Sequence, residues 1–130
     1  MGRGKTSDGV LDVDLAFPVE MGGPGGATNP EQLLAIGYAA CFESAMGVVA
    51  RRERADVGDV KIESTVVLRD NDEKGYELDV ALDVTMPSVD DTDTAVRIVE
   101  AAHEVCAYSN ATRGNVNMKL TANGRAIDCE

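Results

Sequence analysis

Apolar and polar residues alternate along four stretches of the chain, a pattern typical of β-strands with one buried face. The stretches lie at residues 10–17, 60–68, 76–86 and 116–122. A short polar segment, residues 70–75, joins the second stretch to the third. The sequence therefore predicts a β-hairpin over these two stretches.

A long helix is predicted between the first two stretches. Its start is marked by Pro30, which suits a first helical turn because the N–H that proline lacks is unpaired there anyway. Two pairs of residues fit the capping pattern of a helix start, either Thr28 with Glu31 or Asn29 with Gln32. Both alternatives place the beginning of the helix at the same point.

The middle of this helix, residues 33–50, is apolar on all sides and carries a single charge, Glu43. The helix is predicted to reach about Glu53, and its apolar part has nearly the length of a membrane span. We interpret it as a buried core helix, because a charge in the middle of a span is costly and the small residues around it suit close helix packing.

A second helix is predicted from about residues 91–93 to Cys106, because apolar residues recur there at helical spacing. The polar segment 108–114 is expected to form a loop, and the tail from Asn123 is expected to fray. The order of elements predicts an α+β fold in one domain, residues 1–130, with helices on one face of a mostly antiparallel sheet.

Acidic residues outnumber basic residues by 23 to 12, which gives a formal net charge of −11. A surface of this sign repels phosphate backbones and anionic lipid headgroups, so we expect neither nucleic acid nor a membrane as a partner. The chain has three cysteines and no recognisable signal peptide. This combination indicates a reducing compartment, and we expect a cytoplasmic protein.

The three cysteines differ in their predicted surroundings. Cys41 lies within the buried helix, where a lone cysteine usually packs as a small hydrophobic residue. Cys106 closes the apolar stripe of the second helix and faces the same core, so the two can pair if their Cα atoms lie within about 7 Å. Cys129 is interpreted as an exposed bystander, and His103 as a partly exposed helix residue.

One set of four potential zinc ligands exists, namely Cys41, His103, Cys106 and Cys129. Structural zinc sites usually have two closely spaced ligand pairs, and this set has only one, so a zinc-binding structural domain is the weakest interpretation. Glu43 is interpreted as a solvated or interface carboxylate, with a role as a base beside Cys41 as the alternative.

Six motifs occur in a fixed order along the chain. They are residues 7–9 (SDG), 22–26 (GGPGG), 28–33 (TNPEQL), 37–42 (GYAACF), 102–106 (AHEVC) and 108–115 (YSNATRGN). Together, and over nearly the whole chain, these motifs closely resemble those of the organic hydroperoxide resistance (Ohr) proteins of the OsmC/Ohr family.

The resemblance implies an OsmC-like fold, an intertwined homodimer and two active sites at the subunit interface. It implies that Cys41 is the peroxidatic cysteine, that Cys106 resolves it, and that Glu31 holds a catalytic arginine beside the thiolate. Arg3 is the candidate for that arginine. The implied substrates are alkyl and fatty-acid hydroperoxides, and the implied reductant is a lipoylated protein or a similar dithiol, with no metal and no bound cofactor.

The chemistry of these residue types agrees with the implied roles. A thiolate splits the O–O bond and becomes a sulfenic acid, which a second thiol converts to a disulfide. A guanidinium favours the thiolate and stabilises the leaving oxygen. An apolar site favours organic hydroperoxides because each buried CH₂ contributes about 0.8 kcal/mol. The alternative function is a non-enzymatic redox sensor or a small-molecule-binding protein of the same fold.

The spacing of Glu31 and Cys41 adds a geometric expectation. Ten residues of straight helix cover about 15 Å, so the two side chains cannot share one site on one unbroken helix. Either the chain bends between them, or Glu31 serves Cys41 of the partner subunit. We expect the second arrangement.

Three features depart from the family pattern. The family has a strand of about a dozen residues before its catalytic arginine, and here we expect that strand to be missing or shortened. Arg3 aligns with the catalytic position only across a short deletion, and it lies close to the N-terminus, where chains fray. Ala107 stands where the family usually has proline, which leaves the second helix free to run past Cys106.

Overall fold

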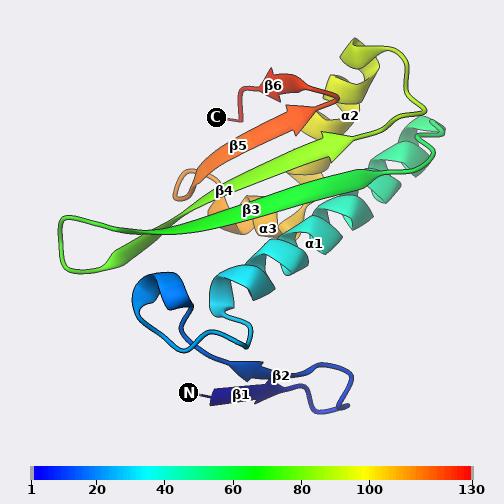
Figure 1. Cartoon of the computed structure of the whole chain (residues 1–130). Coiled ribbons are helices and arrows are strands. Elements are labelled where there is room, and N and C mark those ends of the chain that lie inside the picture. The colour runs from blue at the N-terminus through cyan, green and yellow to red at the C-terminus, as the bar shows by residue number, and fades with distance from the viewer. Residues whose placement is uncertain (1, 130) are drawn as a thin grey trace. The chain divides into compact units, whose positions relative to one another are not determined.

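The computed structural model describes residues 2–129, which form two compact units divided after Leu34 (Figure 1). In the first unit, β1 (Gly2–Lys5) pairs antiparallel with β2 (Asp12–Leu15). β2 is the centre of the strand predicted at residues 10–17, whereas β1 was not predicted. The short strand β1 contains Arg3, which is therefore part of a strand pair and not of a frayed end.

Helix α1 (Pro30–Glu53) begins in the first unit, after a 3₁₀ turn, η1 (Val19–Met21), and a glycine-rich loop. The backbone N–H of Gln32 donates to Asn29 Oδ1 at 2.9 Å, so Asn29 caps the helix. The Thr28 hydroxyl donates to Gln32 Oε1 at 2.7 Å. Of the two predicted cap pairs, Asn29 with Gln32 is the one that forms.

The second unit holds a four-stranded sheet in the order β3-β4-β5-β6. Its strands are β3 (Lys61–Asp70), β4 (Tyr76–Thr85), β5 (Asn117–Ala122) and β6 (Arg125–Ile127). β3 pairs with β4, and β5 with β6, in antiparallel fashion, but β4 and β5 run parallel. The sheet is therefore mixed. The helical crossover between β4 and β5 returns the chain to the end of the sheet at which β4 begins, so β5 runs in the same direction as β4.

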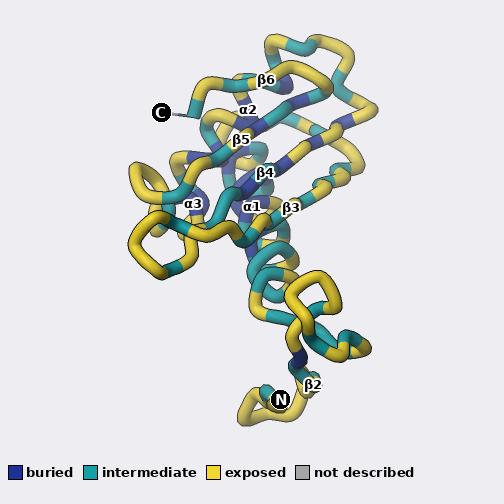
Figure 2. Tube along the Cα trace, turned by 60° about the vertical axis from the view of Figure 1, so that its left-hand side comes forward, coloured by how far each residue is buried: buried dark blue, intermediate teal, exposed yellow. Residues whose placement is uncertain are grey.

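Helices cover one face of this sheet, which confirms the α+β fold (Figure 1). α2 (Thr92–Val105) begins at its cap residue, Asp91, whose side chain accepts a hydrogen bond from the backbone N–H of Asp93. Buried residues gather where the helices meet β4 and β5 (Figure 2). The largest fully buried side chains include Tyr38, Phe42 and Met46 of α1.

Helix α1 is long and apolar enough to cross a bilayer by length and composition. The core helices of many proteins meet the same criterion, so it is weak evidence for a span. In this structure the side chains of α1 that are buried lie in the core of the second unit, consistent with the predicted core helix.

Two segments near the C-terminus differ from the prediction. Residues 108–114, predicted as a loop, lie mostly in a short helix, α3 (Ala107–Thr112). The tail from Asn123 does not fray at once but turns at Asn123 and Gly124, both in the left-handed region, and returns as β6. An Asn-Gly pair is a strong hairpin signal because both turn positions require positive φ angles.

Candidate functional site

Two cysteines meet in the second unit. α1 presents Cys41 from its middle, and the junction of α2 and α3 presents Cys106. The Cys106 thiol donates to the Cys41 sulfur across 3.4 Å, and both cysteines are free. Cys41 is half-buried, whereas Cys106 is only 1% exposed. An incoming molecule therefore reaches Cys41 before Cys106.

The position of Cys106 depends on a break between two helices. Cys106 has extended backbone angles (φ −63°, ψ 123°), and it ends α2 and begins α3. Its N–H still donates to the Ala102 carbonyl at 2.8 Å, and its carbonyl accepts from the Asn110 N–H at 3.0 Å. The expectation that α2 runs past Cys106 because Ala107 replaces proline is therefore wrong: the extended conformation at Cys106 ends the helix without proline.

The surroundings shift the pKa values of the two thiols in opposite directions. Burial raises the pKa of Cys41. Hydrogen bonds from the backbone of Tyr108, the Cys106 thiol and the backbone of Ala107 lower this pKa by more than burial raises it, so the net shift is downward. Burial also raises the pKa of Cys106; contacts with Ser109 oppose this, and the neighbouring Cys41 adds to it, so the net shift is upward. Of the two thiols, Cys41 therefore ionises more readily, and the Cys106 thiol donates a hydrogen bond to it.

A buried polar network lies against Cys106. Ser109, which has no exposed surface, has its Oγ 2.8 Å from the Tyr38 hydroxyl and 2.9 Å from His103 Nδ1. The Tyr38 hydroxyl also lies 3.3 Å from Thr112 Oγ1 and 3.3 Å from Met118 Sδ. This network was not predicted from the sequence, and His103, predicted to be partly exposed, is buried.

The other two predicted site residues, Arg3 and Glu31, lie in the first unit. The Arg3 guanidinium forms a two-pronged ion pair with Asp12, with Nε 2.7 Å from Oδ1 and Nη2 2.6 Å from Oδ2. This contact raises the pKa of Arg3 and lowers that of Asp12. Glu31 lies half-buried in the first turn of α1. The carboxylate that holds Arg3 within this chain is therefore Asp12.

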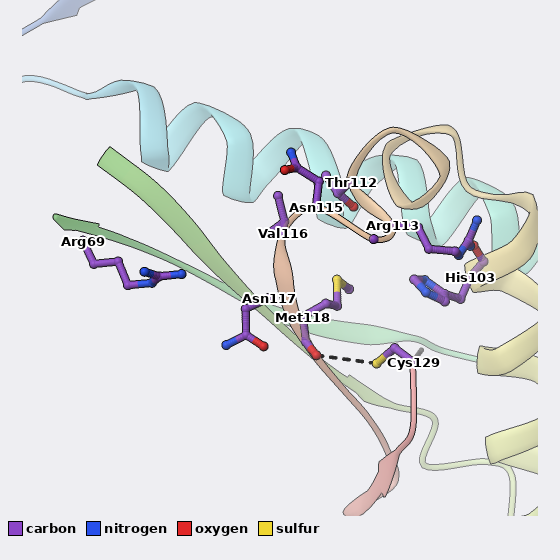
Figure 3. Close-up of a pocket in the computed structure, with 10 residues that line it drawn as sticks. Arg69, His103, Thr112, Arg113, Asn115, Val116, Asn117, Met118 and Cys129 are labelled. Atoms are coloured by element: carbon purple, nitrogen blue, oxygen red, sulfur yellow. Dashed lines mark hydrogen bonds between the residues drawn. The ribbon is translucent and has the colours of Figure 1, made fainter. Parts of the chain in front are cut away.

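Cys129 is not the exposed bystander that was predicted. It is half-buried against the core, and its thiol contacts the backbone carbonyls of Ile127 at 3.4 Å and Met118 at 3.7 Å. It borders a cavity of about 470 Å³ together with His103 and Arg113, while Arg69 lies at the other end (Figure 3). His103 therefore borders this cavity and also contacts Ser109 of the buried network.

The four predicted zinc ligands do not form a cluster in the described residues. Within residues 2–129, no group of three or more His, Cys, Asp and Glu side chains is placed to hold a metal ion. The four predicted zinc ligands are therefore not a zinc site. Glu43 is exposed, as predicted for a solvated carboxylate.

Comparison with known proteins identifies the family of this chain. Residues 23–121 match the family model of OsmC-like proteins. The chain belongs to the OsmC-like protein family. Its sequence is 45% identical over 122 residues to the organic hydroperoxide resistance protein of Xanthomonas axonopodis pv. citri, covering 92% of this chain and 84% of that protein. The prediction of the family is confirmed.

Solved structures of OsmC-like proteins share the fold. An organic hydroperoxide resistance protein, OsmC, of Legionella pneumophila is 52% identical, with a TM-score of 0.89 over 92% of this chain and 87% of that chain. A Vibrio cholerae protein of 43% identity has a TM-score of 0.91 over 97% of this chain and 86% of that chain. Its crystal structure has a molecule of captopril bound in one of the active sites.

Proposed function

We propose that this OsmC-like protein is a thiol-dependent peroxidase that reduces organic hydroperoxides to alcohols. The observation that carries the proposal is the pair Cys41 and Cys106, with sulfur atoms 3.4 Å apart and pKa values shifted in opposite directions. The names of the relatives from Xanthomonas and Legionella, and the active site of the Vibrio relative, support an enzyme acting on organic hydroperoxides.

In the first step, the Cys41 thiolate attacks the terminal oxygen of the hydroperoxide, the one that carries hydrogen, and the O–O bond breaks. The alkoxide leaves with a proton as the alcohol, and Cys41 becomes a sulfenic acid. The hydrogen bonds that lower the pKa of Cys41 favour its reactive thiolate form. Because Cys41 is half-buried, the hydroperoxide reaches it directly.

In the second step, Cys106 attacks the Cys41 sulfenic acid. A disulfide forms, and the sulfenic hydroxyl leaves as water together with the proton of the Cys106 thiol. The sulfur atoms must move from 3.4 Å to a bonded distance of about 2.0 Å, which requires only a small displacement. An external dithiol, proposed to be of the lipoyl type, then attacks the more exposed Cys41 and restores both thiols by exchange.

We propose Arg3 as the guanidinium beside Cys41, held there by Glu31 in place of the Asp12 carboxylate that it contacts in this structure. Glu31 and Cys41 lie on one continuous helix, which separates them by about 15 Å along its axis. We therefore propose a homodimer in which Arg3 and Glu31 of one chain serve Cys41 of the partner subunit. Within described residues 2–34, only Ala16 is buried, so this unit has large apolar side chains for a partner to cover.

The neighbourhood of Cys41 favours an organic substrate. Gly37 lies one turn before Cys41 on α1, and a Cβ placed on Gly37 would approach the Tyr108 ring, with the hydroxyl at 3.1 Å. Tyr108 therefore packs against the helix beside Cys41 and stays 40% exposed. Its ring offers an apolar wall to the alkyl group of a hydroperoxide, where each buried CH₂ contributes about 0.8 kcal/mol.

Turnover separates this proposal from its alternative, a redox sensor. The purified protein is mixed with cumene hydroperoxide and excess dihydrolipoamide, and loss of peroxide is followed. We expect many turnovers in the wild type, none in Cys41→Ser, and near wild-type activity in the control Cys129→Ser. One equivalent of peroxide consumed without turnover would contradict the enzyme and favour the sensor. The expected setting is the cytoplasm, where dithiols keep the cysteines reduced.

A further inference from the structure

The end of α2 leaves backbone carbonyls without their helical partners. In a continuous helix each carbonyl accepts from the N–H four residues on, so the His103 carbonyl would pair with Ala107. The Glu104 carbonyl would likewise pair with Tyr108. The extended backbone of Cys106 (φ −63°, ψ 123°) breaks this pattern. The two carbonyls therefore need other donors.

Two side chains at the far end of α3 supply those donors. Arg113 Nη2 donates to the His103 carbonyl at 2.6 Å, and Figure 3 shows the Arg113 side chain extending toward His103. Asn110 Nδ2 donates to the Glu104 carbonyl at 3.2 Å. A third bond, from Arg113 Nη1 to Asn110 Oδ1 at 2.6 Å, joins the two donors. Arg113 and Asn110 thus form a clamp on the last turn of α2.

The charge of Arg113 suits this position. Within residues 2–129, Arg113 forms no ion pair with a carboxylate, although acidic residues are abundant in the chain. Its guanidinium lies instead at the C-terminus of α2, where the helix dipole favours a positive charge and arginine can bind the last carbonyls. Because hydrogen bonds from a charged donor are the stronger class, Arg113 stabilises the broken end of α2 more than a neutral side chain would.

The position of the Cys106 thiol depends on this break. The thiol is 1% exposed and lies 3.4 Å from the Cys41 sulfur. If Cys106 took helical angles, α2 would continue past it and the thiol would turn with the backbone. The Ala107 N–H would then compete with Arg113 for the His103 carbonyl. Alanine permits this change, because it does not disfavour helical angles in the preceding residue as proline does. The clamp supplies the restraint that Ala107 lacks.

We infer that Arg113 and Asn110 are positioning residues of the resolving step, which hold the Cys106 thiol in place for its attack on Cys41. The inference rests on the proposed peroxidase function and concerns only its second step. The chemistry of that step is unchanged: the S–O bond of the sulfenic acid breaks, the S–S bond forms, and the hydroxyl leaves as water with the thiol proton. The clamp acts through the backbone beside Cys106.

The lifetime of the Cys41 sulfenic acid tests the inference, since this lifetime does not depend on how fast Cys41 was oxidised. After one equivalent of cumene hydroperoxide, timed samples are trapped with dimedone, and the adduct and the disulfide are measured by mass spectrometry. Arg113→Met keeps the length of the side chain but removes its donors, so we expect the sulfenic acid to persist about tenfold longer. Arg113→Lys, which keeps the charge, should lengthen the lifetime less. Arg52→Met, the control, removes an exposed arginine from the last turn of α1 and should leave the lifetime unchanged.

The substitution Ala107→Pro separates positioning from general stability. Proline confines the preceding residue to extended angles and lacks the N–H that would continue α2. Residue 107 is the first of α3, where proline fits. Ala107→Pro combined with Arg113→Met should therefore return the lifetime to near the wild-type value, although the lost hydrogen bonds are not restored. Alone, Ala107→Pro should slow the oxidation of Cys41, because the Ala107 backbone helps to lower the pKa of that thiol, but it should not lengthen the lifetime.

A second clamp variant covers the case of an unfolded Arg113→Met. Asn110 is exposed, and Asn110→Ala should lengthen the lifetime by a smaller factor. Thermal unfolding shows which variants fold. A wild-type lifetime in the folded clamp variants overturns the inference, and so does a long lifetime that Ala107→Pro fails to shorten. Cys106→Ser lacks the resolving thiol and should hold the sulfenic acid. Its absence there would instead contradict the proposed function.

Discussion

The sulfur atoms of Cys41 and Cys106 lie 3.4 Å apart, although 65 residues separate the two cysteines in the chain. The contact depends on two features of the fold. Both α1 and α2 contribute side chains to one core, and the extended backbone at Cys106 ends α2 where its thiol meets Cys41 of α1. The pair is therefore in place before any oxidant arrives.

Removing Cys106 should stop the reaction at the sulfenic acid. In Cys106→Ser, cumene hydroperoxide should still oxidise Cys41, because the half-buried nucleophile is intact. Without the second thiol, excess peroxide should convert the sulfenic acid to the irreversible sulfinic acid. Intact-protein mass spectrometry should show the gain of one and then two oxygen atoms. The control Cys129→Ser should gain no oxygen atoms and should form the disulfide between Cys41 and Cys106. Rapid disulfide formation in Cys106→Ser would contradict the pairing of Cys41 with Cys106.

The two thiols should titrate in opposite senses. The lowered pKa of Cys41 means that this thiol ionises at a lower pH than an ordinary cysteine, whereas the raised pKa of Cys106 means the opposite. The pH at which alkylation by iodoacetamide reaches half its maximum should therefore be lower for Cys41 than for Cys106. Cys106→Ala removes one donor and should move the Cys41 midpoint upward, with Cys129→Ser as the unchanged control. A lower midpoint for Cys106 than for Cys41 would disprove the assignment.

Hybrid dimers should reveal whether the arginine acts between subunits. Arg3→Gln and Cys41→Ser should each be inactive alone. After unfolding and refolding together, mixed dimers should contain one intact site built from Arg3 of one chain and Cys41 of the other. Random pairing predicts recovery of about a quarter of the wild-type activity. Recovery should also occur with Glu31→Gln in place of Arg3→Gln, and none should occur if the arginine acts within its own chain.

Two glycines of α1 offer a matched test of the Tyr108 contact. At Gly37 a new Cβ would lie 3.1 Å from the Tyr108 hydroxyl, whereas at Gly47 the nearest side-chain atom is 4.0 Å away. Gly47→Ala should stabilise the protein by about 0.5–1 kcal/mol through helix propensity and leave peroxidase activity unchanged.

Gly37→Ala should gain less stability, because Tyr108 must move. It should also slow the oxidation of Cys41 severalfold, since the backbone of Tyr108 stabilises that thiolate. Thermal unfolding and the rate of peroxide consumption measure the two effects. Equal behaviour of the two variants in both measurements would contradict a role for the contact between Gly37 and Tyr108.

The sequence predicted the elements whose pattern is local. The strict alternation over residues 76–86 located β4, observed at Tyr76–Thr85, almost to the residue. Pro30 marked the start of α1 because proline fits only a first helical turn. The motif around Asn123 and Gly124 could also have predicted β6, since both residues adopt the positive φ angles of a hairpin turn.

Other features depend on tertiary contacts that no local pattern records. Alternation does not give strand direction, so the parallel pairing of β4 with β5 had no signal in the strands themselves. α3 has no apolar stripe: the residue it buries is Ser109, whose polar contacts replace apolar packing. The pattern placed the end of the second helix at about Cys106, as observed, but the distance between Cys41 and Cys106 depends on tertiary packing and could not be predicted from it.

The most direct test of the account is the disulfide that forms after one equivalent of cumene hydroperoxide. The protein is oxidised, alkylated, digested without reduction and mapped by mass spectrometry. We expect a single new bond between Cys41 and Cys106, with Cys129 still reduced and therefore alkylated. A bond that includes Cys129, or an unoxidised Cys41 after the peroxide has been consumed, would contradict it.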